Sequence, residues 1–323
     1  MEHSGENSGG AATPSPGRLD WVDVARGIGI IAVVVGHVWT RGPVRDAMYS
    51  FHMPLFFLLS GMLSRPQPIG RFTMRQLFSQ MRPYFLFLAL VIAADQIIEP
   101  LKGNRPIFRD WPQDIGPLLL GGSWLAGPFI IFWFVPCLMV ARILFNAFSY
   151  RWPDPLTHRW GLAVLPMLLV AYASGHITRL SPLGLLTVPM AFVLLWVGAA
   201  WHRVGWRGSM MIPLLLLAMA GLSGLLPSLN MRTADYGWPL ASMGAAIATS
   251  FLIFNLSARI APHAAPLAAI GRGSLTIMYL HVPLIHYLSP YMDKLPLLAL
   301  ALFAPFALDR LIRLSPRATR WLL

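Results

Sequence analysis

Arg26 and His37 are the two residues whose chemistry and spacing stand out in this sequence. They are eleven positions apart, which is close to three full turns of a helix, so both side chains point to the same face. Their levels along the helix axis differ by roughly 16 Å, at about 1.5 Å per residue. A guanidinium pairs with phosphate groups, and an imidazole exchanges protons near neutral pH. The spacing therefore predicts an anion-binding group and a proton-transfer group on one helical face.

The composition places this helix in lipid. Of the 323 residues, 56% are hydrophobic and only 12% are charged, whereas a soluble globular domain carries about 25% charged residues. Ionisable side chains at membrane depth are costly, and they normally face a bundle interior or a watered cavity. Taken alone, His37 could be a helix-packing histidine and Arg26 a snorkelling charge that sets topology. Their shared face favours a functional pair.

Apolar runs separated by polar or Pro/Gly segments predict an all-α, polytopic transmembrane bundle of about ten spans. We place the spans near residues 22–40, 50–64, 83–99, 129–148, 161–176, 183–201, 211–229, 238–257, 273–289 and 295–314. Several are shorter than the ~20 residues that a straight span needs. Ser60 and Gly61, near the end of the second span, are expected to allow close helix contact.

The distribution of basic residues predicts the orientation of the bundle. With ten spans, most of the 25 Lys and Arg residues fall on the side that holds both termini, and the positive-inside rule assigns that side to the cytoplasm. This arrangement also explains the net charge of +12 without nucleic acid. Lys102 and Lys294 are the only lysines. We interpret this arginine bias as typical of a GC-rich bacterial genome, and we expect a multi-pass protein of a bacterial inner membrane.

The N-terminal segment differs in composition from the remainder of the chain. Residues 1–17 are rich in Gly, Ser and Pro and lack the pattern of a signal peptide. We expect them to form a disordered cytoplasmic tail. Residues 18–323 then make up a single transmembrane domain.

Other polar side chains are predicted at the depth of His37. Asp95, at the outer end of the third span, could orient an imidazole and stabilise its charged form, as in a catalytic triad. A water-facing charge near a helix end is the alternative for Asp95. Three neutral imidazoles, from His37, His52 and His281, could in principle bind zinc. The sequence has no close-spaced pair of metal ligands, so we expect no metal site.

Four motifs resemble those of a known family. They are Arg26-x10-His37 in the first span, SFHMPLFFLLSG over residues 50–61, FWFVP over residues 132–136 and YLH over residues 279–281. Together they resemble the acyltransferase-3 family of integral membrane O-acyltransferases. The second motif is similar to that of the branch related to fucose 4-O-acetylase. The resemblance spans nearly the whole chain and is strongest over residues 18–62.

The resemblance implies an enzyme that moves an acyl group from acyl-CoA to a hydroxyl of a bacterial surface or exported glycan, with acetyl-CoA as the leading donor. It implies His37 as the general base and Arg26 as the group that binds acyl-CoA. It makes candidates of further residues, namely catalytic His52 and substrate-binding Trp133, Tyr279 and His281. The expected partners are the acyl-CoA, a glycan or lipid-linked sugar and membrane lipid, and a homo-oligomer is left open.

A multi-span transporter or flippase of a glycan or acyl carrier is the alternative function. Intramembrane histidine and aspartate residues mark proton relays, and broken helices mark transport sites. Against this reading, the chain shows no internal repeat, and transport leaves the shared face of Arg26 and His37 unexplained.

Overall fold

The computed structural model describes residues 20–322, which form helices and connecting segments without a named strand. The one β-type pairing in this part of the chain is an isolated bridge between Asn230 and Asp235. The predicted all-α fold is confirmed. The predicted tail, residues 1–17, lies outside the described residues.

The helices follow one another with short connections. They are α1 (Asp20–Val38), α2 (Pro43–Tyr49), α3 (His52–Met62), α4 (Ile69–Leu101), α5 (Ile115–Leu120), α6 (Phe134–Arg151), α7 (Gly161–Ile177), α8 (Val188–Val204), α9 (Met211–Leu222), α10 (Ala241–Ile260), α11 (Ala265–Arg272), α12 (Ser274–Leu288), α13 (Lys294–Arg313) and α14 (Pro316–Leu322). Short 3-10 segments include η2 (Gly127–Trp133), which leads into α6, and η6 (Met231–Thr233).

All ten predicted segments contain a helix, but they do not all have the length of a span. Seven helices among the described residues are long and apolar enough to cross a membrane. The pair α11 and α12, bent by 73° at the break between them, would make an eighth. Helix α3 has 11 residues and α9 has 12, and each is too short to cross a hydrocarbon layer of about 30 Å alone. The count of ten spans and the cytoplasmic termini stay predictions.

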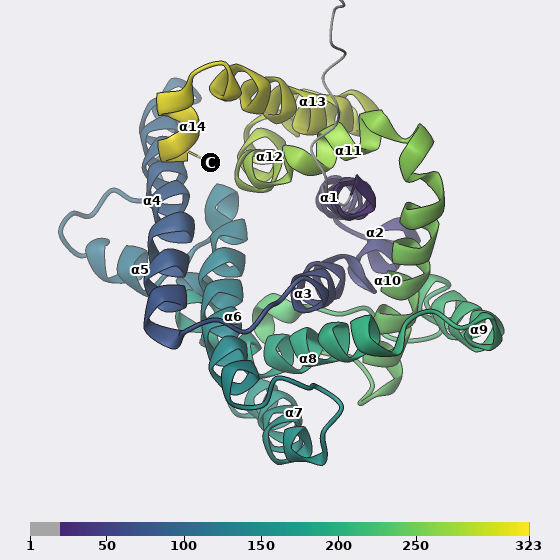
Figure 1. Cartoon of the computed structure of the whole chain (residues 1–323). Helices are drawn as coiled ribbons and strands as arrows, with labels where there is room; N and C mark the ends of the chain where they lie inside the picture. Colours follow the sequence, from purple (N-terminus) through teal and green to yellow (C-terminus); the bar gives the residue numbers. More distant parts are fainter. Residues whose placement is uncertain (1–19, 323) are drawn as a thin grey trace, which may run out of the picture.

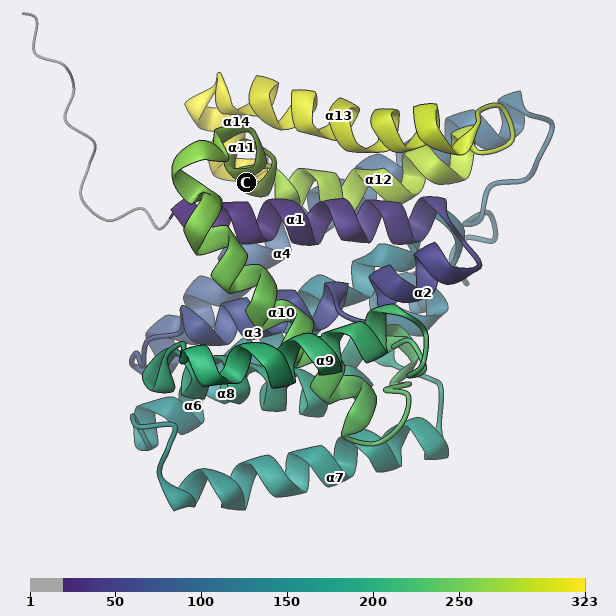
Figure 2. The same cartoon turned by 90° about the vertical axis from the view of Figure 1, so that its right-hand side faces the viewer.

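Helices α1, α3, α6 and α12 surround the middle of the bundle in Figure 1, and α4 runs along its left edge. Helix α7 lies at the periphery in Figures 1 and 2. Only 17% of its most apolar stretch is buried, against 67% for α1. An apolar helix with so little protein cover is suited to face lipid. Helix α1, by contrast, is mostly covered by other helices. Its ionisable side chains therefore lie within the bundle, as such groups at membrane depth require.

Two helix crossings depend on the absence of a side chain. At the crossing of α3 and α8, a Cβ atom on Gly61 would overlap the carbonyl oxygen of Leu195, and one on Gly198 would overlap that of Leu58. Small residues let membrane helices approach to backbone contact. The expectation for Gly61 is confirmed, and the close crossing fixes the position of α3.

The contact between α1 and α11 also depends on glycines without a side chain. A Cβ atom on Gly27 would overlap the carbonyl oxygen of Leu267, and one on Gly271 would overlap that of Asp23. This contact holds Arg272, the last residue of α11, beside the first turns of α1. Two helices from opposite ends of the chain thus meet next to Arg26.

Replacing Gly198 with alanine tests the α3–α8 crossing. The added methyl group meets backbone, which cannot rotate away, so we expect Gly198→Ala to destabilise the protein by about 1–3 kcal/mol. The measurement is the midpoint of thermal unfolding in detergent, monitored by fluorescence-detected size-exclusion chromatography. Gly161→Ala is the matched control, because a Cβ atom there meets nothing within 4 Å. Equal melting of the two variants would contradict the backbone contact.

Candidate functional site

One face of α1 carries the two predicted groups and the residues between them. Arg26, Ile30 and Val33 line one cavity, and His37 lines a second. Their spacing of four, three and four residues keeps all of them on one side of the helix. The predicted shared face of Arg26 and His37 therefore opens onto two spaces at different levels of the bundle.

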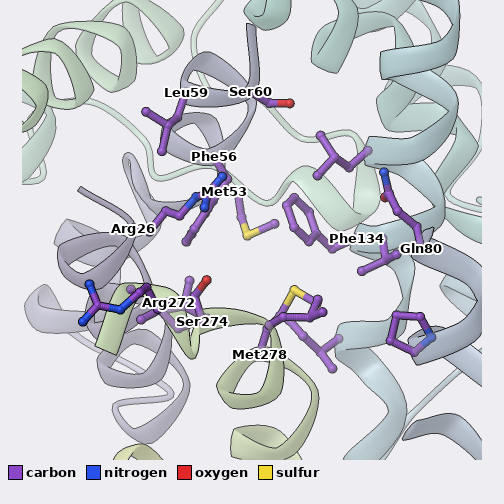
Figure 3. A pocket seen from close by; sticks show the side chains of 18 of the residues that line it. Arg26, Met53, Phe56, Leu59, Ser60, Gln80, Phe134, Arg272, Ser274 and Met278 are labelled. Carbon is purple, nitrogen blue, oxygen red and sulfur yellow. The ribbon is translucent and has the colours of Figure 1, made fainter. Parts of the chain in front are cut away.

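The larger space, which we call the arginine cavity, has a volume of about 530 Å³. Figure 3 shows its wall, where Arg26 and Arg272 lie near Ser274, and Gln80 and Phe134 lie across from them. Residues of α1, α3, α4, α6, α11, α12 and α13 contribute to the lining. Four of the lining residues are arginines: Arg26, Arg142, Arg272 and Arg313.

Two buried carboxylates lie beside these arginines. Asp23 has its Oδ1 3.7 Å from Nη1 of Arg26 and its Oδ2 3.7 Å from Nη1 of Arg272. Asp309 accepts hydrogen bonds from Arg313 at 2.7 Å and 3.2 Å. Neither aspartate is among the residues that line the cavity. The carboxylates hold the arginines in place, and the cavity wall keeps a positive charge.

Arg142 differs from the other three arginines of the wall. It lies in the middle of α6, and no carboxylate among residues 20–322 comes within 4.0 Å of it. Its guanidinium carbon lies 6.0 Å from the ring centre of Phe72, and it is close enough to Arg26 for the two charges to repel. A largely buried cation without a counter-ion is costly. An anionic ligand in the cavity would remove that cost.

The smaller space, which we call the histidine cavity, has a volume of about 120 Å³ and is lined by His37 and His52. The ring of His281 lies against His37, with 5.0 Å between the ring centres, and the His37 and His52 centres are 6.5 Å apart. Tyr49 lies 4.7 Å from His52 by the same measure. Three helices, α1, α3 and α12, thus bring their histidines to one point.

All three histidines make the same hydrogen bond to their own helix. Nδ1 of His37 donates to the carbonyl of Val33 at 2.8 Å. His52 and His281 do the same to the carbonyls four residues before them, at 2.7 Å and 2.8 Å. A carbonyl oxygen only accepts, so the proton is assigned to Nδ1. In the neutral ring Nε2 is then a free acceptor, and Nε2 of His281 has no partner in the part of the chain that the structure describes.

The two cavities adjoin each other. Met53 of α3 and Ile131 of η2 line both of them. Val33 links the two levels as well, since its side chain faces the arginine cavity while its carbonyl holds His37. We call Met53 and Ile131 the partition. The side chains that the two cavities share are therefore apolar.

Two of the predicted substrate-binding residues join the histidine cluster. Trp133 lines the histidine cavity, and His281 packs on His37. Tyr279 is fully buried in an aromatic stack, with its ring centre 4.8 Å from that of Phe87 and 5.2 Å from that of Phe132. Tyr279 lines neither cavity. The geometry therefore supports a packing role for Tyr279 beneath the site.

Asp95 lies elsewhere. Its Oδ1 accepts a hydrogen bond from the hydroxyl of Tyr287 at 2.9 Å, and its Oδ2 accepts from the backbone N–H of Ile107 at 2.8 Å. The Nδ1 of His37, which a triad carboxylate would hold, is bonded to Val33 instead. Asp95 thus links α4 to α12, and the geometry offers no support for a role of Asp95 in orienting His37.

Sequence reasoning missed several residues that line the cavities. Arg142, Arg272 and Arg313 were counted only as charges that set topology, and the residues Arg45, Tyr49 and Arg232 of the histidine cavity were not singled out. Arg142 did carry a signal, because it interrupts an apolar run. Within the described residues, no group of three or more His, Cys, Asp or Glu side chains is placed to hold a metal ion.

The fold and the paired cavities define a polytopic membrane protein with a buried histidine cluster beside a basic cavity. A family model described as an acyltransferase domain matches residues 19–308. The chain belongs to this acyltransferase-3 family, as its motifs predicted, and the membership favours the enzyme over the transporter. Neither a curated protein nor a solved structure matches the chain.

The link between Asp95 and Tyr287 can be tested by removing one hydroxyl. Tyr287→Phe leaves the buried carboxylate with the N–H of Ile107 as its remaining donor, so we expect a loss of stability on the order of 1–3 kcal/mol. The readout is thermal unfolding in detergent. Tyr291→Phe is the control, because Tyr291 is 68% exposed. Unchanged melting of Tyr287→Phe would show that this hydrogen bond does not hold α4 to α12.

Proposed function

We propose that this protein is a membrane O-acyltransferase that moves an acyl group, acetyl in the first instance, from acyl-CoA to a hydroxyl of an exported or surface glycan. The observation that carries the proposal is the meeting of the arginine cavity and the histidine cavity at Met53 and Ile131. Family membership supports the acyl transfer, and the two cavities suit its two substrates.

The arginine cavity suits the donor. Coenzyme A is a polyanion with a long, thin pantetheine arm, and guanidinium groups bind phosphate through paired hydrogen bonds. Arg26 and Arg142 would hold its phosphates. The apolar residues Ile30, Val33 and Met53 lead from there towards His37. The distance of roughly 16 Å along α1 matches an extended arm rather than a compact ligand.

The histidine cluster suits the transfer step. Nε2 of His37 would take the proton of the acceptor hydroxyl as its oxygen attacks the thioester carbonyl carbon. The C–S bond then breaks, and the departing CoA thiolate receives the proton from the imidazolium. His52 lines the same cavity, where its Nε2 can accept a hydrogen bond from the incoming hydroxyl, and the buried His281 packs against His37. The product is an ester, and free CoA returns to the arginine cavity.

The size of the histidine cavity favours a short acyl group. Its volume is about 120 Å³, against about 530 Å³ for the arginine cavity. An acetyl group with the reacting hydroxyl fits this space, whereas a long acyl chain does not. The motif of residues 50–61 supports the branch related to fucose 4-O-acetylase, where the acceptor is a sugar.

The location follows from the charge distribution. We assign the protein to the inner membrane of a bacterium, with both termini in the cytoplasm. The arginine cavity then opens towards the cytosolic pool of acyl-CoA, and His37 faces the exported glycan or lipid-linked sugar. The positive-inside rule supports this orientation.

Replacing His37 tests the base. His37→Gln keeps a polar side chain but removes the proton acceptor, so we expect the transfer rate to fall by about 10²–10⁴-fold. The assay is release of free CoA from acetyl-CoA by purified protein with a glycan acceptor. His176→Gln is the control, because His176 is exposed on the peripheral helix α7. A His37→Gln enzyme with the wild-type rate would refute the assignment.

Replacing Arg142 tests the donor site. We expect Arg142→Gln to raise the KM for acetyl-CoA about 10-fold, the effect of losing one charged hydrogen bond. With S-acetylpantetheine, which has no phosphate, the variant and the wild type should have equal KM values. Arg151→Gln, at the exposed end of the same helix, is the control. If the variant impairs both donors equally, Arg142 does not bind phosphate.

A further inference from the structure

Two arginines line the histidine cavity, and the transfer chemistry does not use them. They are Arg45 of α2 and Arg232 of η6, which lie in segments 187 positions apart in the chain. Asn230 and Tyr49 lie in the same wall. No carboxylate is among the described residues that line this cavity. A cavity that receives a sugar hydroxyl therefore also presents two positive charges.

Arg232 is poorly paired for a largely buried cation. Its Nη2 donates to the carbonyl of Leu125 at 2.7 Å, with the carbonyl of Ser123 at 3.5 Å. Its Nε is buried and has no hydrogen-bond partner, and no salt bridge to it occurs within residues 20–322. Burial lowers the pKa of Arg232 below its ordinary value, because loss of water contacts disfavours the charged form. Carbonyl contacts hold the arginine in place and leave its charge unbalanced.

Arg45 lines the same cavity and packs on the ring of Tyr49. Its guanidinium carbon lies 4.1 Å from the ring centre of Tyr49, and Nη1 lies 2.9 Å from Oδ1 of Asp46. The side chain of Asp46 is 44% exposed and also accepts a hydrogen bond from Ser228. Solvent weakens such an exposed pair. Both Arg45 and Arg232 act electrostatically on the Tyr49 hydroxyl, so the two charges converge on one region.

Tyr49 adds a neutral donor to the same cavity wall. Burial raises the pKa of Tyr49 above its ordinary value, so its hydroxyl stays protonated. Two guanidinium groups and a phenol form a site that accepts an oxyanion through several hydrogen bonds. A neutral sugar would leave the charge of Arg232 buried and unpaired, which is unfavourable.

We propose that Arg45 and Arg232 select an acceptor that carries an oxyanion close to the acylated hydroxyl. This inference rests on the proposed function and names the class of its acceptor. The same chemistry has two sources, a carboxylate of a uronic acid within the glycan and the diphosphate of a lipid-linked sugar. Arg45 and Arg232 hold the oxyanion, and the neighbouring hydroxyl reaches His37.

Matched acceptors test the proposal. Purified protein receives acetyl-CoA and one acceptor from two matched pairs. The first pair is cellotetraose and the same tetrasaccharide oxidised to its glucuronate form. The second pair is a prenyl glucoside that lacks phosphate and glucosyl diphosphate-prenol. We expect one anionic acceptor to exceed its neutral partner at least about 10-fold in kcat/KM, as a charged hydrogen bond predicts. The pair that shows the preference identifies the carboxylate or the diphosphate as the source.

Substitutions then assign the preference to the two arginines. Arg232→Gln and Arg45→Gln should each lower the ratio of anionic to neutral kcat/KM at least about 10-fold, and Arg232→Lys should retain part of it. A variant that folds poorly lowers both rates and leaves the ratio unchanged. Arg109→Gln is the control, since Arg109 lies in another loop beside Asp110 and lines neither cavity.

The outcomes separate this proposal from the proposed function. Equal use of anionic and neutral acceptors, or a preference that survives both glutamine variants, overturns the oxyanion site and leaves the acyltransferase intact. Failure to consume acetyl-CoA with every acceptor counts against the acyltransferase. Binding is measured separately, as the rise in unfolding temperature caused by the preferred anionic acceptor without acetyl-CoA. We expect that rise in the wild type and not in Arg232→Gln, and its absence in the wild type overturns the site.

Discussion

The backbone contact between α1 and α11 is the interaction on which the arginine cavity depends. Gly27 and Gly271 lie against each other's helix with no space for a side chain. Asp23 reaches Arg26 within its own helix, and at this separation it comes within reach of Arg272 as well. A wider crossing would separate this buried carboxylate from one of its two cations, which is unfavourable in a membrane. Two glycines far apart in the sequence thus set the position of Arg272 beside Asp23 and Arg26.

The orientation of the three histidine rings depends on hydrogen bonds within their own helices. Each ring gives its Nδ1 proton to a carbonyl of its own helix, so the tautomer and ring orientation need no partner from another element. This explains why a carboxylate is not required beside His37, and why Asp95 can tie Tyr287 to the segment at Ile107. The rings are then brought together only by helix packing.

The parts that the sequence predicted correctly depend on local periodicity. The shared face of Arg26 and His37 follows from helix geometry alone, and the ten apolar segments each proved helical. The meeting of His37 with His281 could not be derived from spacing, since they are on helices distant in the chain. The family motif made His281 a candidate site residue without pairing it with His37. Arg142 was counted as a topology charge because its lack of a carboxylate becomes visible only when α6 is packed against the other helices.

The two cavities are both positive, and this gives the apolar partition its importance. Met53 and Ile131, which line both cavities, are apolar and place no charge where the two adjoin. In the proposed function, the CoA phosphates would stay with the arginines, and only the thin, uncharged pantetheine arm would pass these two side chains. The proposed separation of phosphate binding from acyl transfer thus depends on two apolar side chains as much as on the polar ones.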